Sequence, residues 1–404
     1  MSDRHFAFWP PKVPREITLP ETSLWYNLEV SATRYPQKAC TVFYDSVIRY
    51  ADFRRQAELL AGYLQRECDV KRGDRVALFM HNSPQWMLAF YAALRADAMV
   101  VPINPMNVTA ELAYVLQDCG ARVLIGAQTL FPHVEPLLAS GALPHAVVAT
   151  YSDALTTPTD LAVPDFVREP RRAFAGAVAM SDAIAKAYEP RPAEAGPDDR
   201  CVMPYTSGTT GQPKGCVHTH RSVMHTAIAG AQWHRSFADE TILTVLPLFH
   251  VTGMQNSMNG PIYSGATMVV LPRWDRDVAA ALIQRFRVTG WTSVPTMVVD
   301  LLSSPKLEQY DLSSLRATGG GGAAMPEAIA QKLEKLCNLT YVEGYGLSET
   351  AAATHINPQQ NPKKQCLGIP IFGVDSRVVD PETLRELPAG EVGEIITSGP
   401  QVFE

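Results

Sequence analysis

An alternation of helical and strand-like segments begins near residue 50 and limits the folds open to this chain more than any other feature. Over Ala51–Cys68 the apolar residues recur at helical spacing, and the short apolar run Arg75–Met80 that follows is typical of a buried strand. The same order then repeats as a helix over Pro84–Ala96, a strand over Met99–Ile103, a helix over Thr109–Asp118 and a strand over Arg122–Ile125. Such alternation predicts an α/β protein whose mainly parallel sheets are joined by right-handed crossovers.

The alternation is interrupted between residues 151 and 199, where Pro and Ala are frequent and strand character is weak, as in a connecting segment. It resumes with expected strands at Ile242–Pro247 and Thr267–Leu271 and a helix at Val278–Arg287. Beyond Cys337, short strands between Gly and Pro turns predict a small β-rich, barrel-like lobe. We therefore expect an extension over residues 1–22 and one large domain over 23–404, with two stacked βα subdomains over about 23–190 and 191–337 and the lobe over 338–404.

The composition excludes several classes of protein. With 46% hydrophobic and 19% charged residues, the 404-residue chain is neither disordered nor a small disulfide scaffold. Its seven cysteines are scattered without metal-ligand spacing, which favours a reducing, cytoplasmic location. A formal net charge of -6 argues against a nucleic-acid partner.

The stretch from Thr241 to Pro272 has no Asp, Glu, Lys or Arg over 32 residues, which raises the question of a membrane span. Prolines, glycines and amide side chains interrupt it, so a spanning helix would leave polar groups in lipid. We expect no transmembrane segment. The N-terminus also lacks the apolar core of a signal peptide, so export is not expected.

The segment Tyr205–Gly215 reads Tyr-Thr-Ser-Gly-Thr-Thr-Gly-Gln-Pro-Lys-Gly and is the sharpest local signal. Its glycines allow tight backbone curvature, its hydroxyls are hydrogen-bond donors, and Lys214 adds a positive charge, which together suit a polyphosphate. A P-loop NTPase is disfavoured, because its Walker A sequence has Gly directly before the Lys and Ser or Thr directly after it. Here Pro213 precedes Lys214 and Gly215 follows it.

This segment resembles the signature loop of the adenylate-forming superfamily, the AMP-dependent synthetases and ligases that include acyl-CoA synthetases. Three further segments support the resemblance in the expected order: Pro247–Gly253 resembles the acyl-pocket motif, Thr318–Pro326 the adenine-binding turn, and Tyr345–Thr350 the third core motif. The resemblance covers nearly the whole chain from about residue 25. It implies the fold of an acyl-CoA synthetase N-terminal domain.

Physical chemistry supports two of these motifs independently of the resemblance. The four glycines Gly319–Gly322 precede a helix with Pro326 at its start, and they would let the backbone lie flat against a planar base. Glu349 lies just before the apolar run Ala351–Ala353, where a carboxylate without a partner is costly, so Mg²⁺ is a reasonable ligand.

The resemblance implies roles for individual residues. It gives Lys214, His250, Ser348 and Glu349 catalytic roles, with Glu349 as the magnesium ligand. It places the nucleotide at Thr206, Ser207, Gly208, Thr209, Thr210, Gly211, Lys214, Gly320, Gly321, Gly322, Ala323, Glu343, Gly344, Tyr345, Gly346 and Ser348. It places the acyl group at His250, Val251, Thr252, Met254, Val294 and Met297.

The implied reaction is that of an acid–thiol ligase, which uses ATP and Mg²⁺ to form an acyl-adenylate and then passes the acyl group to coenzyme A. The apolar pocket candidates favour a medium- or long-chain fatty acid. An aryl-CoA ligase and a nucleotide-binding module without catalysis remain open, as does a homodimer. Because relatives continue into a smaller C-terminal domain, we expect this piece to bind nucleotide but to catalyse poorly.

Overall fold

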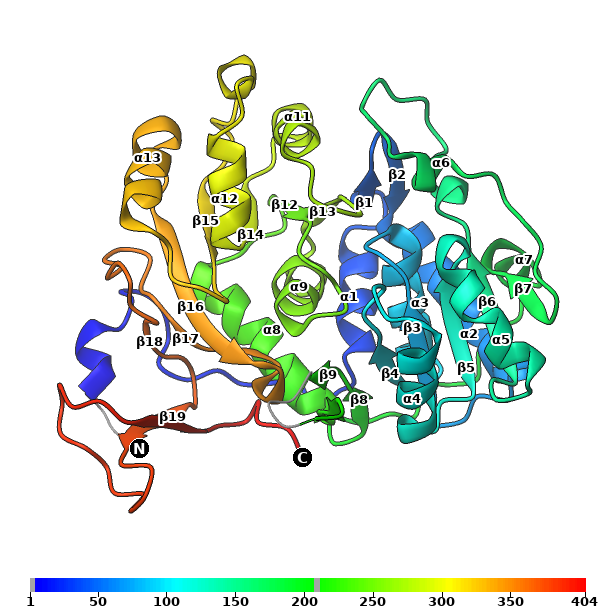
Figure 1. The fold of residues 1–404 in the computed structure, drawn as a ribbon, viewed down its shortest axis with the longest axis horizontal. Coiled ribbons are helices and arrows are strands. Elements are labelled where there is room, and N and C mark those ends of the chain that lie inside the picture. Colours follow the sequence, from blue (N-terminus) through cyan, green and yellow to red (C-terminus); the bar gives the residue numbers. More distant parts are fainter. Residues whose placement is uncertain (1–3, 207–210) are drawn as a thin grey trace.

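The computed structural model describes residues 4–206 and 211–404, and two large sheets lie side by side in it (Figure 1). The described strands of the first sheet run in the order β11-β8-β4-β3-β5-β6-β7, all parallel except β11. Their bounds are β3 Arg75–Phe79, β4 Met99–Pro102, β5 Val123–Ala127, β6 His145–Ala149, β7 Ala177–Ala179, β8 Arg200–Val202 and β11 His218–Thr219.

The second sheet has the order β18-β17-β16-β15-β14-β12-β13-β1-β2 among the described strands. The strands from β16 to β1 are parallel, whereas β2, β17 and β18 pair antiparallel at the two edges. The bounds are β1 Ala39–Phe43, β2 Ser46–Arg49, β12 Thr241–Thr244, β13 Thr267–Val270, β14 Gly290–Ser293, β15 Ala317–Gly320, β16 Tyr341–Leu347, β17 Ala352–Ile356 and β18 Ile369–Pro370.

Both faces of the first sheet are buried. Along β3, Val76 and Leu78 belong to the core beneath α2 (Tyr50–Glu67) and α3 (Pro84–Arg95). Ala77 and Phe79 belong to the core beneath α4 (Thr109–Cys119) and α5 (Glu135–Ala139). Successive side chains of a strand point to opposite faces, so a strand covered on both sides reads as a continuous apolar run. The core that contains Val76 and Leu78 also includes residues of the second sheet, so one continuous core joins the two sheets.

The helices cover the sheets in layers. In Figure 1, α11, α12 and α13 form a row over one face of the second sheet, and α8 lies on its other side. The helices are α1 Trp25–Arg34, α2 Tyr50–Glu67, α3 Pro84–Arg95, α4 Thr109–Cys119, α5 Glu135–Ala139, α6 Asp165–Arg168, α7 Met180–Ala185, α8 His220–His234, α9 Val251–Met254, α10 Gly260–Ser264, α11 Arg276–Phe286, α12 Pro295–Leu302 and α13 Glu327–Cys337. The short turns are η1 Arg4–Phe8, η2 Gln128–His133, η3 Tyr151–Ala154, η5 Leu307–Gln309 and η6 Ser348–Thr350, and the π-helical turn is η4 Gln255–Asn259.

The predicted α/β class with mainly parallel sheets is confirmed, and the expected helices and strands recur with ends shifted by a few residues. The expected subdomain boundaries do not coincide with those of the sheets. Strand β1 pairs with β13, with Thr41 opposite Met268, so an early segment completes the later sheet. Strands β16–β18 also extend that sheet, and beyond them the hairpin β19 Asp375–Val379 with β20 Glu394–Ser398 stands apart. None of the helices described is long and apolar enough to cross a membrane.

Candidate active site

A short hairpin holds the ends of the signature segment. Strand β9, Tyr205–Thr206, pairs antiparallel with β10, Lys214–Gly215, so that Thr206 lies opposite Lys214. The Tyr205 hydroxyl donates to Asp118 at 2.5 Å, and the hydroxyl of Tyr114 donates to the Pro213 carbonyl at 3.0 Å. Lys214 is exposed on this hairpin. The expected phosphate contacts Ser207, Gly208, Thr209 and Thr210 lie outside the described residues.

The glycine run meets the neighbouring strands at very close range. A Cβ on Gly320 would stand 1.8 Å from the Ser293 carbonyl oxygen, and one on Gly321 would stand 2.5 Å from that of Gly344. Any larger residue at these positions would therefore collide with backbone. Only Gly322, with φ +84°, has open space where its side chain would be. We expected the glycines to accommodate a flat ligand, whereas at least two of them are required where the neighbouring backbone approaches closely.

Glu343 binds two backbone segments. One carboxylate oxygen accepts a hydrogen bond from the Met325 amide at 2.9 Å, and the other accepts one from the Gln365 amide at 2.7 Å. The residue is 8% exposed. Its observed contacts thus fix the ends of two loops around β16, whereas the resemblance placed it at the nucleotide.

The third core motif forms the end of β16 and the 3₁₀ turn η6. The Thr350 hydroxyl accepts a hydrogen bond from the Leu347 amide at 3.0 Å and donates to the Ala352 carbonyl at 2.8 Å, which closes the turn. His218 donates from Nε2 to the Ser348 carbonyl at 2.7 Å, so the first sheet is tied to this turn. Ser348 and Glu349 are half-buried beside it.

Glu349 places negative charge near Cys216, which follows β10, and near His218 of β11. Burial raises the pKa of the Cys216 thiol to about 11, and the Glu349 carboxylate contributes to that rise. Burial lowers the pKa of His218, against the opposing effects of the Ser348 carbonyl and Glu349. Among the described residues no group of three or more His, Cys, Asp or Glu side chains could hold a metal. A single carboxylate nevertheless fits Mg²⁺, which proteins often bind through one or two carboxylates plus substrate phosphates.

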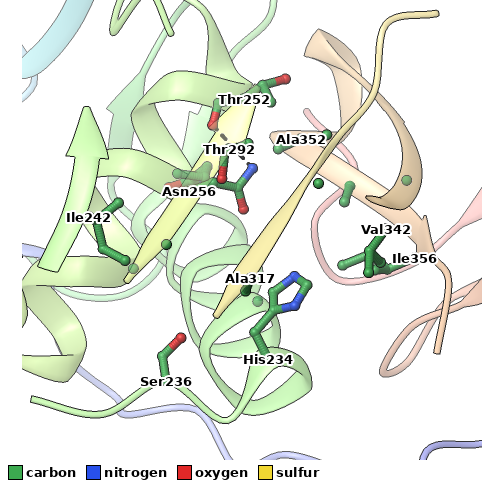
Figure 2. A pocket seen from close by; sticks show the side chains of 18 of the residues that line it. His234, Ser236, Ile242, Thr252, Asn256, Thr292, Ala317, Val342, Ala352 and Ile356 are labelled. Carbon is green, nitrogen blue, oxygen red and sulfur yellow. Dashed lines mark hydrogen bonds between the residues drawn. The ribbon is translucent and has the colours of Figure 1, made fainter. Parts of the chain in front are cut away.

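A cavity of about 310 Å³ lies between α8 and strands β14, β15 and β16. Figure 2 shows side chains from both sides converging on it, with Thr252 and Ala352 at one end and His234 and Ser236 at the other. Its wall contains eight of the expected site residues, namely His250, Thr252, Gly320, Gly321, Gly322, Gly344, Tyr345 and Gly346. The cavity therefore brings the expected nucleotide-binding turn and the expected acyl motif together.

His250 stands at the start of α9 and lines the cavity. Its Nδ1 accepts a hydrogen bond from the Thr252 amide at 3.3 Å, which leaves Nε2 as the protonated nitrogen of a neutral ring. Desolvation by the surrounding protein lowers the pKa of His250. The ring is therefore neutral near pH 7 and can donate from Nε2.

A buried hydrogen-bonded chain supports the helix after His250. The Tyr91 hydroxyl donates to Asn259 at 3.0 Å, Asn259 donates to the Gln255 side-chain oxygen at 2.8 Å, and Gln255 donates to the Thr226 hydroxyl at 2.6 Å. These contacts cross the π-helical turn η4, a type of irregularity that is frequent at functional sites. The chain fixes the cavity wall against both α3 and α8.

The structure does not bring the other expected acyl residues to the cavity wall. Val251 and Met254 are buried, and Met254 packs in the main core. Val294 precedes α12, and Met297 packs against the core from within that helix. None of these four residues lines the cavity. Ala323, which was expected at the nucleotide, is exposed and does not line it either. Apolar character alone did not distinguish a cavity wall from the core, because both exclude water.

Sequence reasoning missed several residues that do line the cavity. On α8 these are Thr226, Ala227, Gly230, Ala231 and His234, and elsewhere they include Glu240, Asn256 and Gln359. The α8 residues recur at spacings of one, three or four, which places them on one helical face. The sequence signal that could have identified this wall is the row of mostly small residues on one face of α8, which ends at His234.

Comparisons with known proteins cover most of this chain. A family model described as "AMP-binding enzyme" matches residues 28–404. A long-chain-fatty-acid–CoA ligase of Bacillus subtilis (strain 168) is 32% identical over 98% of this chain and 73% of its own length. The 4-coumarate–CoA ligase 4 of Arabidopsis thaliana is 29% identical over 89% of this chain and 62% of its own.

The fold also matches solved structures. The anthranilate CoA ligase AuaEII, determined in complex with anthranoyl-AMP, superposes with a TM-score of 0.86 at 25% identity. The match covers 95% of this chain and 71% of the AuaEII chain.

Proposed function

Because the chain belongs to the family of AMP-binding enzymes, we propose that it is an ATP-dependent ligase that joins a carboxylic acid to coenzyme A. In the first half-reaction a carboxylate oxygen bonds to the α-phosphorus of ATP, and the bond between this phosphorus and the bridging oxygen breaks to release pyrophosphate. In the second, the coenzyme A sulfur bonds to the acyl carbon, AMP leaves, and the thiol proton passes to solvent.

One observation carries the proposal: a single cavity is lined by the Gly320–Gly322 turn and Tyr345 on one side and by His250 and Thr252 on the other. Forming an acyl-adenylate requires two anions, the acid and the α-phosphate, to meet in a fixed orientation. Holding both in one site makes their encounter effectively intramolecular.

His250 is suited to the acid in this arrangement. With Nδ1 occupied by the Thr252 amide, the neutral ring presents its Nε2–H toward a carboxylate oxygen of the substrate. Tyr345 offers an aromatic face for the adenine. The glycines at the end of β15 carry no side chains that would occupy the space beside the adenine.

The phosphates require positive charge and donors. Lys214 lies opposite Thr206 at the base of the signature hairpin, and Gly211 follows the Ser207–Thr210 segment. Together with the Ser348 hydroxyl, these groups would stabilise the charge that develops as pyrophosphate leaves, which is usually the largest electrostatic contribution to such a reaction. Glu349 would hold Mg²⁺ with the phosphates, and the metal would neutralise phosphate charge there.

For the acid, we propose a fatty acid of medium or long chain, with aryl acids as the alternative. The Bacillus subtilis relative is named for long-chain fatty acids, whereas the Arabidopsis relative and AuaEII are named for 4-coumarate and anthranilate. The apolar part of the cavity wall includes Ile242, Val342 and Ile356. Such a surface accepts an alkyl chain or an aromatic ring.

The decisive test is a panel of carboxylic acids supplied with ATP, Mg²⁺ and coenzyme A, with AMP, pyrophosphate and acyl-CoA measured in the same reactions. The proposal expects all three products in equal amounts with at least one fatty or aryl acid, formed slowly because this piece is expected to catalyse poorly. ATP binding without any acid-dependent pyrophosphate release would instead favour a nucleotide-binding module. Release of ADP would contradict the adenylate route.

A further inference from the structure

The end of the cavity remote from His250 carries titratable side chains, whereas the wall between the two ends includes the apolar residues Ile242, Ala317 and Val342. His234, Ser236 and Glu240 form this far end, and Figure 2 shows His234 and Ser236 there, beyond Ala317 and Ile242. The cavity follows α8 from Thr226 to His234, about 12 Å at 1.5 Å per residue. If the alkyl chain or aromatic ring of a substrate acid lay along that face, the end of the acid opposite its carboxylate would reach the far end of the cavity.

His234 is the last residue of α8, and a hydrogen bond from the loop after β17 orients its ring. Its Nδ1 lies 3.0 Å from Nε2 of Gln359, which follows β17. With the Gln359 amide as donor, the proton of the neutral ring is on Nε2. Burial lowers the pKa of His234 to about 4, so the ring is neutral near pH 7 although a helix end favours a cation. Among the described residues no hydrogen bond occupies Nε2.

Glu240 provides a hydrogen-bond acceptor at the same end of the cavity. It is half-buried directly before β12, where burial and the nearby Asp239 raise its pKa. Hydrogen bonds from the Ser236 side chain and the Phe237 backbone, and the charge of Arg316, which also lines the cavity, act in the other direction. A carboxylate there accepts hydrogen bonds, and the His234 Nε2–H donates one. A hydroxyl group, which both accepts and donates, matches this pair.

Resting on the proposed ligase function, we propose that the far end binds a hydroxyl group on the substrate, so that the enzyme prefers carboxylic acids hydroxylated at the end opposite the carboxylate. A terminal methyl group would desolvate His234 and Glu240 without replacing their hydrogen bonds. Sites built to bind a hydroxyl discriminate against analogues without it for this reason. The hydroxyl can stand on an alkyl chain or on an aromatic ring.

The test measures equilibrium binding of matched acids by calorimetry in the presence of AMP. One arm compares straight-chain acids with their ω-hydroxy counterparts of equal atom number, and the other compares cinnamate with its para-hydroxy form. We expect the hydroxylated acid to bind about tenfold more tightly in at least one arm. The arm that shows the preference identifies the body of the substrate.

Variants separate this site from general effects on the cavity. His234→Phe should reduce the preference to about one while the unsubstituted acid still binds, and His234→Gln, which keeps an N–H donor, should restore part of it. Ile242→Val changes the apolar wall alone and should leave the preference unchanged. Equal binding of both acids by the unaltered protein, or a preference that survives in His234→Phe, would overturn the inference.

The two proposals fail differently. If acids bind and are adenylated with no preference for a hydroxyl group, only this inference is wrong. If no acid binds or is adenylated at all, the proposed ligase function fails as well. Should His234→Phe not fold, Glu240→Leu provides the same comparison from the accepting side of the pair.

Discussion

The carboxylate of Glu343 accepts a hydrogen bond from the backbone amide of Met325 at 2.9 Å, which ties β16 to the turn that follows the glycine run. Its second oxygen accepts from Gln365 at 2.7 Å. A residue expected at the adenine thus also holds together the two loops that surround the nucleotide site.

We predict that Glu343→Gln destabilises the protein by about 1–3 kcal/mol, because an amide nitrogen replaces one acceptor and leaves a buried backbone donor unpaired. Urea unfolding gives the change in free energy. Glu308→Gln, at an exposed position in η5, is the control and should have little effect. Unchanged stability in Glu343→Gln would contradict a structural role.

Replacing Gly320 by Ala should cost more than about 3 kcal/mol or prevent folding, because the new methyl group would meet the Ser293 carbonyl at 1.8 Å. Thermal unfolding and soluble yield measure the effect. Gly196→Ala serves as the matched change, since its Cβ would meet only an Asp199 oxygen at 3.7 Å. A Gly320→Ala protein as stable as Gly196→Ala would contradict the strand spacing.

His220 makes stability depend on pH. Its Nδ1 accepts from the Leu24 amide at 3.0 Å, and burial lowers its pKa from 6.5 to about 4. The unfolded chain binds a proton at higher pH than the folded chain, so stability is full above pH 6.5 and is lost as pH falls towards 4. Each such histidine contributes about 1.4 kcal/mol per pH unit in that window.

The expected result is a steep decline in unfolding free energy between those pH values, because burial lowers the pKa of His225, His234 and His355 to about 4 as well. His220→Gln keeps an acceptor for Leu24 and should make the decline shallower. His145→Gln, partly exposed on β6, should leave it unchanged. A decline of equal slope in both variants would show that His220 is not involved.

Lys214→Ala should weaken ATP binding about tenfold, because one charge-assisted contact to phosphate is lost. Calorimetry measures the affinity. Since Lys214 is exposed, thermal stability should not change, and Lys335→Ala at the exposed end of α13 should change neither quantity. ATP affinity equal to that of the unaltered protein would remove Lys214 from the phosphate site.

Glu349→Gln should reduce the dependence of ATP affinity on Mg²⁺, because a neutral amide is a poorer ligand for a hard cation. Affinities measured with Mg²⁺ and with chelator give the ratio, which should fall towards one. Glu391→Gln on the exposed β19–β20 connection is the control. A ratio that stays at the level of the unaltered protein would assign the metal elsewhere.

Much of the fold could be read from the sequence because the signals are local. Strand β3 and helices α2 and α3 appear within one or two residues of their expected bounds, since their apolar spacing and their turns are set by neighbours along the chain. The site was only partly predictable. His250, Thr252 and Gly320–Gly322 line one cavity, whereas Met254 packs in the core and Met297 packs against it.

The order of helices and strands, the α/β class and the motifs that meet at the site follow from local sequence signals, because periodicity and glycine placement act over a few residues. Three-dimensional packing was needed to show that β1 pairs with β13, that Glu343 holds two loops, and that Gln359 orients His234. Those contacts join residues distant in sequence, and they depend on how whole layers pack. The wall of the cavity is set by that packing.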